Sequence, residues 1–319
     1  MVEKFKDIPN LIIYVHDFCI YVKSIEEHDE TLRLELQRAQ EIGIKFNLPN
    51  CKFFKTYLKF LGEIYSQNQI TIDPDRVEAM NRMDPPSNIT ELQRFLGVIN
   101  YLRSFIPNMS SHTTNLRKLL KKDTIWEWTE SHNQEFIKIK NLVTNAPVLT
   151  NFDVNKPFLL SADASQDALG AVISQDGKPV AYASTTLTNS QQLWGQIEKE
   201  LLAIHFGCNR FHQYLIGQKI NVQTDHKPLE TLFKKQYNDI PIRLQRIMLK
   251  LERYAIKVKW VPGEKLIIAD TLSGAPLKGN MSDADMLQSE LDCQIAVLDQ
   301  SLSLSFSEKK LEELKLETS

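Results

Sequence analysis

Four acidic residues in the second half of the chain occupy positions that favour a shared metal site. Asp163 and Asp225 each end a predicted strand. Glu200 lies on a predicted helix, and Asp270 opens the last predicted helix. Acids at the ends of neighbouring strands and on a helix packed against them can converge on one point. Their mutual repulsion would then raise the pKa of some of them unless cations hold them together.

Glu200 is the most informative of the four, because it falls on the apolar stripe of a predicted helix from about 190 to 215. The predicted buried stripe consists of Leu193, Ile197, Ile204 and Phe211. An acid on the inner face of a helix is costly unless it is paired or bound to a metal. Each acid alone is more often a cap or loop residue. Together they favour two Mg²⁺ ions about 3.5–4 Å apart, an arrangement suited to phosphodiester hydrolysis, with Mn²⁺ as the alternative ion.

A second candidate site lies near the start of the chain, in the stretch LIIYVHDFCIYVKS. Two apolar, β-branched runs flank His16 and Asp17, which predicts a hairpin with these polar residues at its tip. A histidine beside a carboxylate at such a tip raises the question of whether metal chemistry is available there.

The elements that must position the four acids form a predicted mixed α/β domain at 156–275. Its pattern is strand, strand, helix, strand, helix, strand and a last short helix. Before it, a hairpin, a helix and short strands are predicted at 1–72, helices at 73–120 and a helical connector at 121–155. The tail 276–319 has nine acidic and four basic residues, and we expect it to be weakly ordered.

Composition narrows the function classes. The net charge is −2, so a nucleic-acid surface must come from local patterning. The four cysteines lie far apart without a CxxC pair, which argues against zinc knuckles and a disulfide framework. We found no signal-peptide core or long apolar span. We therefore expect an intracellular protein, in the cytoplasm, the nucleus or both, without a membrane partner. No Walker loop or dinucleotide fingerprint indicates a nucleotide cofactor.

Several motifs now point to a family. SADASQDALGAVISQDGKPVAYAS, EKELLAIHFGCNRFHQYLIG, VQTDHKPLE and KWVPGEKLIIADTLS resemble the RNase H domain of gypsy-class long-terminal-repeat retrotransposon Pol polyproteins. Upstream, YVHD, CKFFKTYLKFLG, LQRFLGVINYLRSFIPN and FDVNKPF resemble the palm end, thumb and connection of the same reverse transcriptase. The resemblance covers residues from about 9 to 276. It implies a partial palm at 1–72, a thumb at 73–120, a connection at 121–155 and an RNase H-like domain at 156–275.

The resemblance implies that Asp163, Glu200, Asp225 and Asp270 are the metal-binding, catalytic acids. Asp163 would bridge both ions, and Asp270 would complete the site of the ion that activates water. Glu200 and Asp225 would hold the ion at the leaving 3′ oxygen. The implied reaction cleaves the RNA strand of an RNA·DNA hybrid, leaving 5′-phosphate and 3′-hydroxyl ends. One departure is Trp260, where some RNases H have a histidine that assists turnover.

The hairpin also departs from the family pattern. Reverse transcriptases usually carry two adjacent aspartates there, and this sequence has His16 followed by Asp17. A neutral imidazole adds no charge to a site for two divalent cations, and Mg²⁺ prefers oxygen ligands. The family's other palm aspartate lies on a strand that this sequence does not include. We therefore expect a degenerate polymerase site and no DNA polymerisation.

Basic residues on a predicted helix form a candidate nucleic-acid surface. Arg243, Arg246, Lys250 and Arg253 recur at spacings of three and four and so share one face. A solvated basic face explains this pattern equally well when it is taken alone. Beside a hybrid-cleaving site it would follow the phosphate backbone, with salt-dependent binding. Lys227 is a further candidate, and His226 is more often a capping residue than a proton carrier.

Three functions remain open from the sequence. The first is a Mg²⁺-dependent ribonuclease H attached to a truncated reverse transcriptase. The second is a transposon remnant that binds nucleic acid or a protein partner without catalysis. The third, an integrase-type relative, is disfavoured because no zinc module of the HHCC kind is present. The partner of the acidic tail is not indicated.

Overall fold

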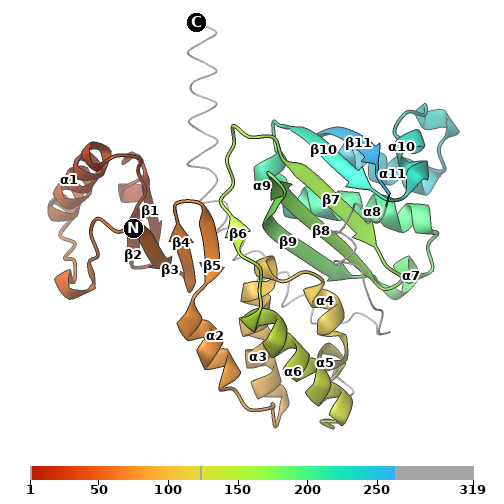
Figure 1. The fold of residues 1–319 in the computed structure, drawn as a ribbon, viewed down its shortest axis with the longest axis horizontal. Coiled ribbons are helices and arrows are strands. Elements are labelled where there is room, and N and C mark those ends of the chain that lie inside the picture. The colour runs from red at the N-terminus through yellow and green to blue at the C-terminus, as the bar shows by residue number, and fades with distance from the viewer. Residues whose placement is uncertain (1, 123, 263–319) are drawn as a thin grey trace, which may run out of the picture. The chain divides into compact units, whose positions relative to one another are not determined.

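The computed structural model describes residues 2–122 and 124–262, which Figure 1 draws as ribbon. The chain divides into two compact units, and the boundary between them falls at Thr56 and Tyr57. The predicted acidic tail and Asp270 lie outside the described residues. Within the described ranges, no helix is both long and apolar enough to span a membrane.

The first unit contains the predicted hairpin. Strands β1 (Leu11–Tyr14) and β2 (Asp17–Ile20) pair antiparallel, with Tyr14 opposite Asp17, so that His16 lies in the turn. Helix α1 (Ile25–Ile42) follows, between 3₁₀ turns η1 (Val2–Lys4) and η2 (Leu48–Asn50). The Ser24 side chain accepts a hydrogen bond from the first turn of α1. A small core of edge-to-face aromatic rings holds the unit together: Phe5, Phe18 and Phe46.

The second unit begins with a four-stranded antiparallel sheet. Its strands are β3 (Tyr57–Phe60), β4 (Glu63–Ser66), β5 (Gln69–Ile72) and β6 (Leu149–Thr150). The helices between β5 and β6 are α2 (Pro74–Asn81), α3 (Ile89–Tyr101), η3 (Leu102–Phe105), α4 (Met109–His112), α5 (Thr114–Lys118) and α6 (Glu130–Thr144). Asn88 caps α3, since its side chain accepts from the Glu91 backbone N–H at 2.9 Å. The apolar faces of these helices share one core.

A five-stranded mixed sheet follows, in the order β11-β10-β7-β8-β9. Its strands are β7 (Leu159–Ala164), β8 (Ala168–Gln175), β9 (Lys178–Thr186), β10 (Lys219–Thr224) and β11 (Ala255–Trp260). Strands β7, β8 and β9 pair antiparallel, whereas β10 lies parallel to both β7 and β11. The helical elements of this part are α7 (Asn189–Gln192), α8 (Gln196–Arg210), α9 (His212–Leu215), α10 (Lys227–Leu232), η4 (Tyr237–Asp239) and α11 (Ile242–Leu251). The predicted mixed α/β fold is confirmed.

The predicted helix at about 190–215 is three helices in the structure. The chain turns at Leu193 and Trp194, and α8 begins after Gly195. Leu193 therefore lies outside the helix and is 88% exposed, so its predicted place on the buried stripe is wrong. The rest of the stripe is as expected, because Ile204 and Phe211 are buried and Ile197 packs against the same core.

Different layers cover the two faces of the five-stranded sheet. Helix α8 packs on the face of β7 and β8 that carries Leu160 and Ala171 (Figure 1). It comes unusually close at Gly207, where an added Cβ would lie 3.0 Å from the Ala171 Cβ. On the other face, Val172 and Tyr182 join the core of the preceding helices. The sheet is thus fixed to the helical segment before it, inside one unit.

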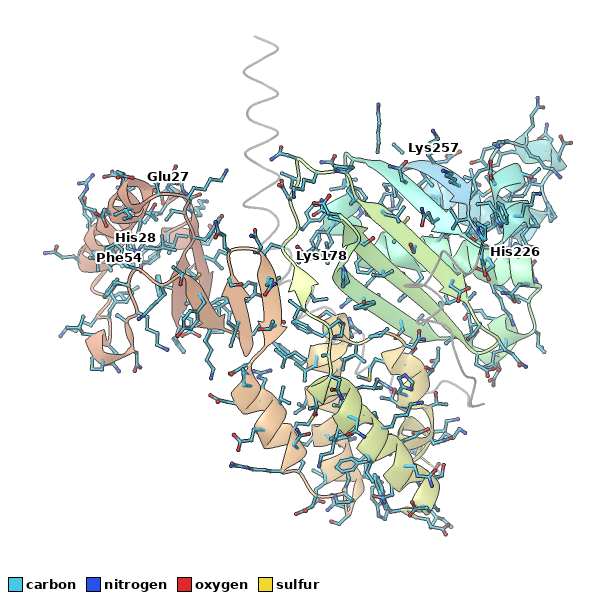
Figure 2. The ribbon with its side chains drawn as sticks, viewed as in Figure 1. Glu27, His28, Phe54, Lys178, His226 and Lys257 are labelled. Atoms are coloured by element: carbon cyan, nitrogen blue, oxygen red, sulfur yellow. The ribbon has the colours of Figure 1, made fainter. Side chains whose placement is uncertain are left out.

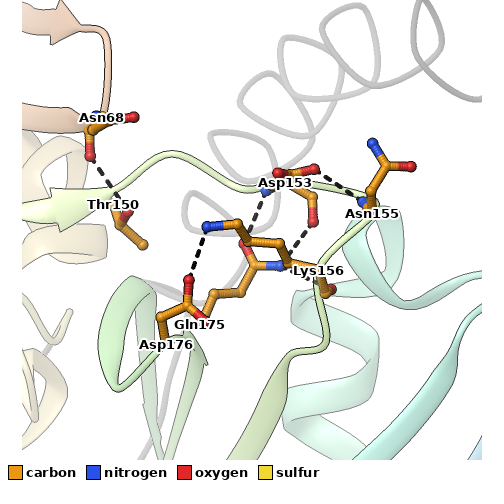
Figure 3. Close-up of polar contacts among 7 residues, drawn as sticks. All are labelled: Asn68, Thr150, Asp153, Asn155, Lys156, Gln175 and Asp176. Carbon is orange, nitrogen blue, oxygen red and sulfur yellow. Dashed lines mark hydrogen bonds and ion pairs between the residues drawn. The ribbon is translucent and has the colours of Figure 1, made fainter.

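The segment that enters this sheet is fixed to the β8–β9 hairpin (Figure 3). The buried Gln175 carboxamide forms two 2.8 Å hydrogen bonds with the Asp153 backbone, accepting from its N–H and donating to its carbonyl. Lys156 forms a 2.9 Å ion pair with Asp176 on the same hairpin. These contacts connect β6 in one sheet to β7 in the other through a constrained segment.

Candidate active site

Two of the predicted acids are brought together by strand pairing. Asp163 lies in β7, and Asp225 directly follows β10. These strands are parallel neighbours, and the last pair in their register is Gln223 with Ser161. Continuing that register by two residues sets Asp225 opposite Asp163. Because residues two apart on a strand point to the same side, both carboxylates belong to one face at the carboxyl end of the strands.

The third acid comes from helix α8. Glu200 lies in its second turn and is 2% exposed. One carboxylate oxygen from each of Asp163, Glu200 and Asp225 lies within 4.8 Å of the others. Asp163 is also buried, whereas Asp225 is exposed. The structure thus brings together three of the four predicted acids, and the fourth, Asp270, lies outside the described residues.

The environment of Glu200 fits a cation. Its Oε1 accepts a 2.6 Å hydrogen bond from Gln196 Nε2, but its Oε2 is buried with no hydrogen-bond partner within the described part of the chain. Burial raises the pKa of Glu200 to about 8, and the charges of Asp163 and Asp225 act in the same direction. An ionised carboxylate in this position needs a positive charge, and carboxylate oxygens are the ligands that Mg²⁺ prefers. The three residues present therefore suit a divalent ion.

Gln196 is a site residue that the sequence did not reveal. Its Nε2 also donates to the Ala164 carbonyl at 2.8 Å, so it joins α8 to the residue after Asp163. The only sequence signal was its position four residues before Glu200, which sets the two on one helix face.

The residues around Asp225, the exposed acid of this cluster, are joined by hydrogen bonds and a cation–π contact. His226, labelled in Figure 2, donates its backbone N–H to Thr224 Oγ1 at 3.1 Å and occupies the N-cap position of α10. Trp260 Nε1 donates to the Asp225 carbonyl at 2.9 Å. The ammonium of Lys227 lies 5.6 Å from the centre of the Trp260 ring. Lys227, which was predicted to bind nucleic acid, therefore lies two residues after Asp225 in the chain.

The predicted basic stripe lies on and just after α11, but its members differ. Arg243 forms a 3.0 Å ion pair with Glu198 and stacks on Trp194. Arg253 donates to Asn209 and lies over the Tyr254 ring. Arg246 and Lys250 are exposed, and neither forms an ion pair with another described residue. Arg246 and Lys250 are therefore the members most available to a phosphate backbone.

The tip of the β1–β2 hairpin differs from the acidic cluster in the burial of its polar side chains. His16 and Asp17 are both exposed. Among the described residues, the only group of three or more acids, histidines or cysteines arranged to hold a metal is the one around Glu200.

Residues 153–254 match the family model for the RNase H-like domain found in reverse transcriptase. The chain therefore contains an RNase H-like domain of the reverse-transcriptase type. This domain includes β7 to β10 and α11, and with them all three clustered acids.

Curated relatives are retroelement polyproteins. The Pol polyprotein of transposon 297 from Drosophila melanogaster is 33% identical over 270 residues, which are 84% of this chain and 25% of that protein. The transposon Tf2-3 polyprotein of Schizosaccharomyces pombe is 34% identical over 271 residues, or 83% of this chain and 20% of that protein. The chain thus spans a quarter or less of the length of these relatives. The predicted resemblance to retrotransposon Pol polyproteins is confirmed.

Solved structures agree on the fold. The foamy viral protease-reverse transcriptase in complex with RNA/DNA hybrid matches with a TM-score of 0.72 and 23% identity, covering 88% of this chain and 39% of that one. The same enzyme in complex with double-stranded DNA matches with a TM-score of 0.69 and 24% identity, covering 82% of this chain and 56% of that one. The RNase H-like domain and the segments before it therefore share the fold of a retroviral reverse transcriptase.

Proposed function

We propose that this protein is a Mg²⁺-dependent endonuclease that cleaves the RNA strand of RNA·DNA hybrids. The observation that carries the proposal is the cluster of Asp163, Glu200 and Asp225, whose ligand atoms lie within 4.8 Å of one another. One buried Glu200 oxygen in it has no hydrogen-bond partner among the residues that the structure describes. The RNase H-like family match and the hybrid bound by the foamy viral relative support the choice of substrate.

Each acid has a distinct part in this proposal. Asp163 and Glu200, buried and fixed by β7 and α8, would hold Mg²⁺, with Mn²⁺ as a substitute. Asp225 is the exposed member and would meet the ion from the solvent side. Asp270 is proposed as the fourth ligand on the strength of the family pattern. Bound Mg²⁺ would supply the charge that activates a water and stabilises the leaving oxygen.

The protein's own residues would also orient the hybrid. Arg246 and Lys250 would contact phosphates first, because Arg243 and Arg253 already bind protein groups. Lys227 would contact the backbone next to the cleaved bond. Such contacts fix register and orientation without reading sequence, which suits an enzyme that must act along a whole hybrid.

The decisive experiment is Mg²⁺-dependent cleavage of an end-labelled RNA·DNA hybrid by the full chain, compared with Asp163→Asn. We expect internal cuts in the RNA strand for the unchanged protein and none for the variant. Double-stranded DNA of the same sequence serves as the control substrate and should stay intact. Binding of the hybrid without any cleavage by either protein would contradict the proposal and support the alternative, a catalytically inactive transposon remnant.

We also propose that the β1–β2 hairpin does not support polymerisation. His16 replaces an aspartate of the family pattern, and an exposed imidazole adds neither charge nor an oxygen ligand for Mg²⁺. A primer-extension assay with the full chain should give no template-directed incorporation. Extension of the primer would overturn this part of the proposal.

A further inference from the structure

Trp260 makes three different contacts around the exposed acid. Its indole Nε1 donates to the Asp225 carbonyl at 2.9 Å. Its backbone N–H donates to Glu230 Oε2 on α10 at 3.2 Å. Its ring faces the ammonium of Lys227, at 5.6 Å. Trp260 therefore connects the end of β11 with the end of β10 and with the start of α10.

Asp225 needs such support more than its two partners do. Asp163 lies within a central strand and Glu200 within a helix, so the backbone of each is fixed by regular hydrogen bonding. Asp225 lies between β10 and α10, where strand pairing has ended. The backbone of Thr224, just before it, is still held by Val261, whose N–H donates to the Thr224 carbonyl at 3.0 Å. The Trp260 indole N–H holds the next residue, because it donates to the carbonyl of Asp225 itself.

The ring of Trp260 also determines the position of a positive charge. Lys227 follows Asp225 by two residues, and its flexible side chain would otherwise sample many rotamers. A cation over an indole face is attracted by the electron-rich face of the ring. Glu230 on α10 forms its 2.7 Å ion pair with Lys234. The ammonium of Lys227, two residues after Asp225, is thus held at the Trp260 ring.

We propose that Trp260 is a positioning residue that fixes Asp225 for metal binding through its indole N–H and Lys227 for nucleic-acid binding through its ring. The proposal rests on the nuclease function proposed above and adds a residue that no part of the acid pattern identifies. Two separable contacts imply two separable effects. Loss of the N–H should weaken metal binding, and loss of the ring should also weaken binding of the hybrid.

The test compares Trp260→Phe, which keeps a ring but removes the N–H, with Trp260→Leu, which removes both. Mn²⁺ affinity is measured by calorimetry without substrate, and KM and kcat for hybrid cleavage are measured separately. We expect Trp260→Phe to bind Mn²⁺ about tenfold more weakly, a typical effect of losing a partner behind a metal ligand, with KM unchanged. Trp260→Leu should lose Mn²⁺ affinity to the same extent and raise KM as well. Lys227→Gln should raise KM alone.

Trp126→Phe is the matched control, because it deletes the same N–H from a tryptophan in the irregular segment before α6, which packs against the other core of the second unit. Its Mn²⁺ affinity should equal that of the unchanged protein. Unchanged affinity in Trp260→Phe would overturn the proposed role of Trp260 alone. Failure of the unchanged protein to bind Mn²⁺ and to cleave hybrid would overturn the nuclease proposal.

Should Trp260→Phe not fold, the unchanged protein still provides a test. Labelled with ¹⁵N at its four tryptophans, it has four indole N–H signals. The signal that paramagnetic Mn²⁺ broadens most should exchange slowly with solvent, because that N–H is bonded to the Asp225 carbonyl. A rapidly exchanging N–H would overturn the proposal.

Discussion

The Gln196 carboxamide donates to Glu200 Oε1 at 2.6 Å, one turn away on the same helix. The same Nε2 reaches the Ala164 carbonyl, so one amide group connects the buried acid with the strand that carries Asp163. A neutral donor of this kind stabilises the ionised form of Glu200 without competing for the second oxygen. Glu200 is thus held in one orientation, with Oε2 left for a cation.

This relationship predicts the effect of Gln196→Ala. The hydrogen bond from Gln196 lowers the pKa of Glu200, so its loss should raise that pKa further and let protons compete more strongly with the metal. We expect Mn²⁺ affinity to fall several-fold at pH 7, by about 1 kcal/mol or somewhat more. The deficit should shrink at pH 9, where a larger fraction of Glu200 is ionised in both proteins. Calorimetry at the two pH values checks this, and an equal deficit at both would contradict it.

The raised pKa of Glu200 also predicts how the stability of the metal-free protein depends on pH. Burial raises its pKa from an ordinary 4.5 to about 8. A raised pKa means that the stability from protonated Glu200 is fully present below about pH 4.5 and is lost as pH rises through 8. In EDTA, Glu200→Gln should exceed the unchanged protein in stability by more at pH 8.5 than at pH 5.5, and the two excesses should differ by an amount on the order of a few kcal/mol.

Urea unfolding of both proteins at the two pH values measures the difference. Their comparison removes the contributions of all other titrating groups. Adding Mg²⁺ at pH 8.5 should stabilise the unchanged protein but not the variant. A constant difference between the two across this pH range would show that Glu200 is ionised throughout.

The close approach of α8 to the sheet predicts a position-specific effect of alanine. In Gly207→Ala, the new Cβ would meet the Ala171 Cβ at 3.0 Å and the Leu160 Cδ1 at 3.2 Å. Because Glu200 lies two turns earlier on the same helix, a shift of α8 should weaken Mn²⁺ binding as well as cost about 1–3 kcal/mol of stability.

Gly97→Ala provides the matched control. Gly97 lies in α3 with open space around its Cα, so alanine there should stabilise the protein by up to about 1 kcal/mol. Thermal unfolding and Mn²⁺ calorimetry distinguish the two variants. Equal effects of the two substitutions would contradict the role of Gly207 in placing the helix.

The basic helix predicts a graded response to charge removal. Replacing Arg246 and Lys250 by alanine should weaken hybrid binding at low salt and reduce the salt dependence of binding by about two counterions. Arg243→Ala should have a smaller effect on binding, because its guanidinium is already paired with Glu198 at 3.0 Å. Hybrid affinity measured over a range of salt concentrations, with Asp163→Asn present to prevent cleavage, checks the order. A larger effect of Arg243 than of the pair would contradict it.

Local patterns were sufficient to predict the elements that carry the acids. Strand β10 ends at Thr224, beside Asp225, and the signals for that strand end lie within a few residues of it. Leu193 continues the apolar spacing of α8 but lies outside that helix, because the chain turns there before Gly195. Arg243 and Arg246 are equivalent by spacing, and only the fold shows that Glu198 pairs with Arg243.

The sequence by itself determined which side chains are acidic, that Asp163 and Asp225 end strands, and that Glu200 lies on the inner face of a helix. Only the tertiary structure decided that these three lie within 4.8 Å of one another. That distance depends on the parallel register of β7 with β10 and on the approach of α8 at Gly207. Both are contacts between segments dozens of residues apart, and local periodicity carries no information about which segments will meet.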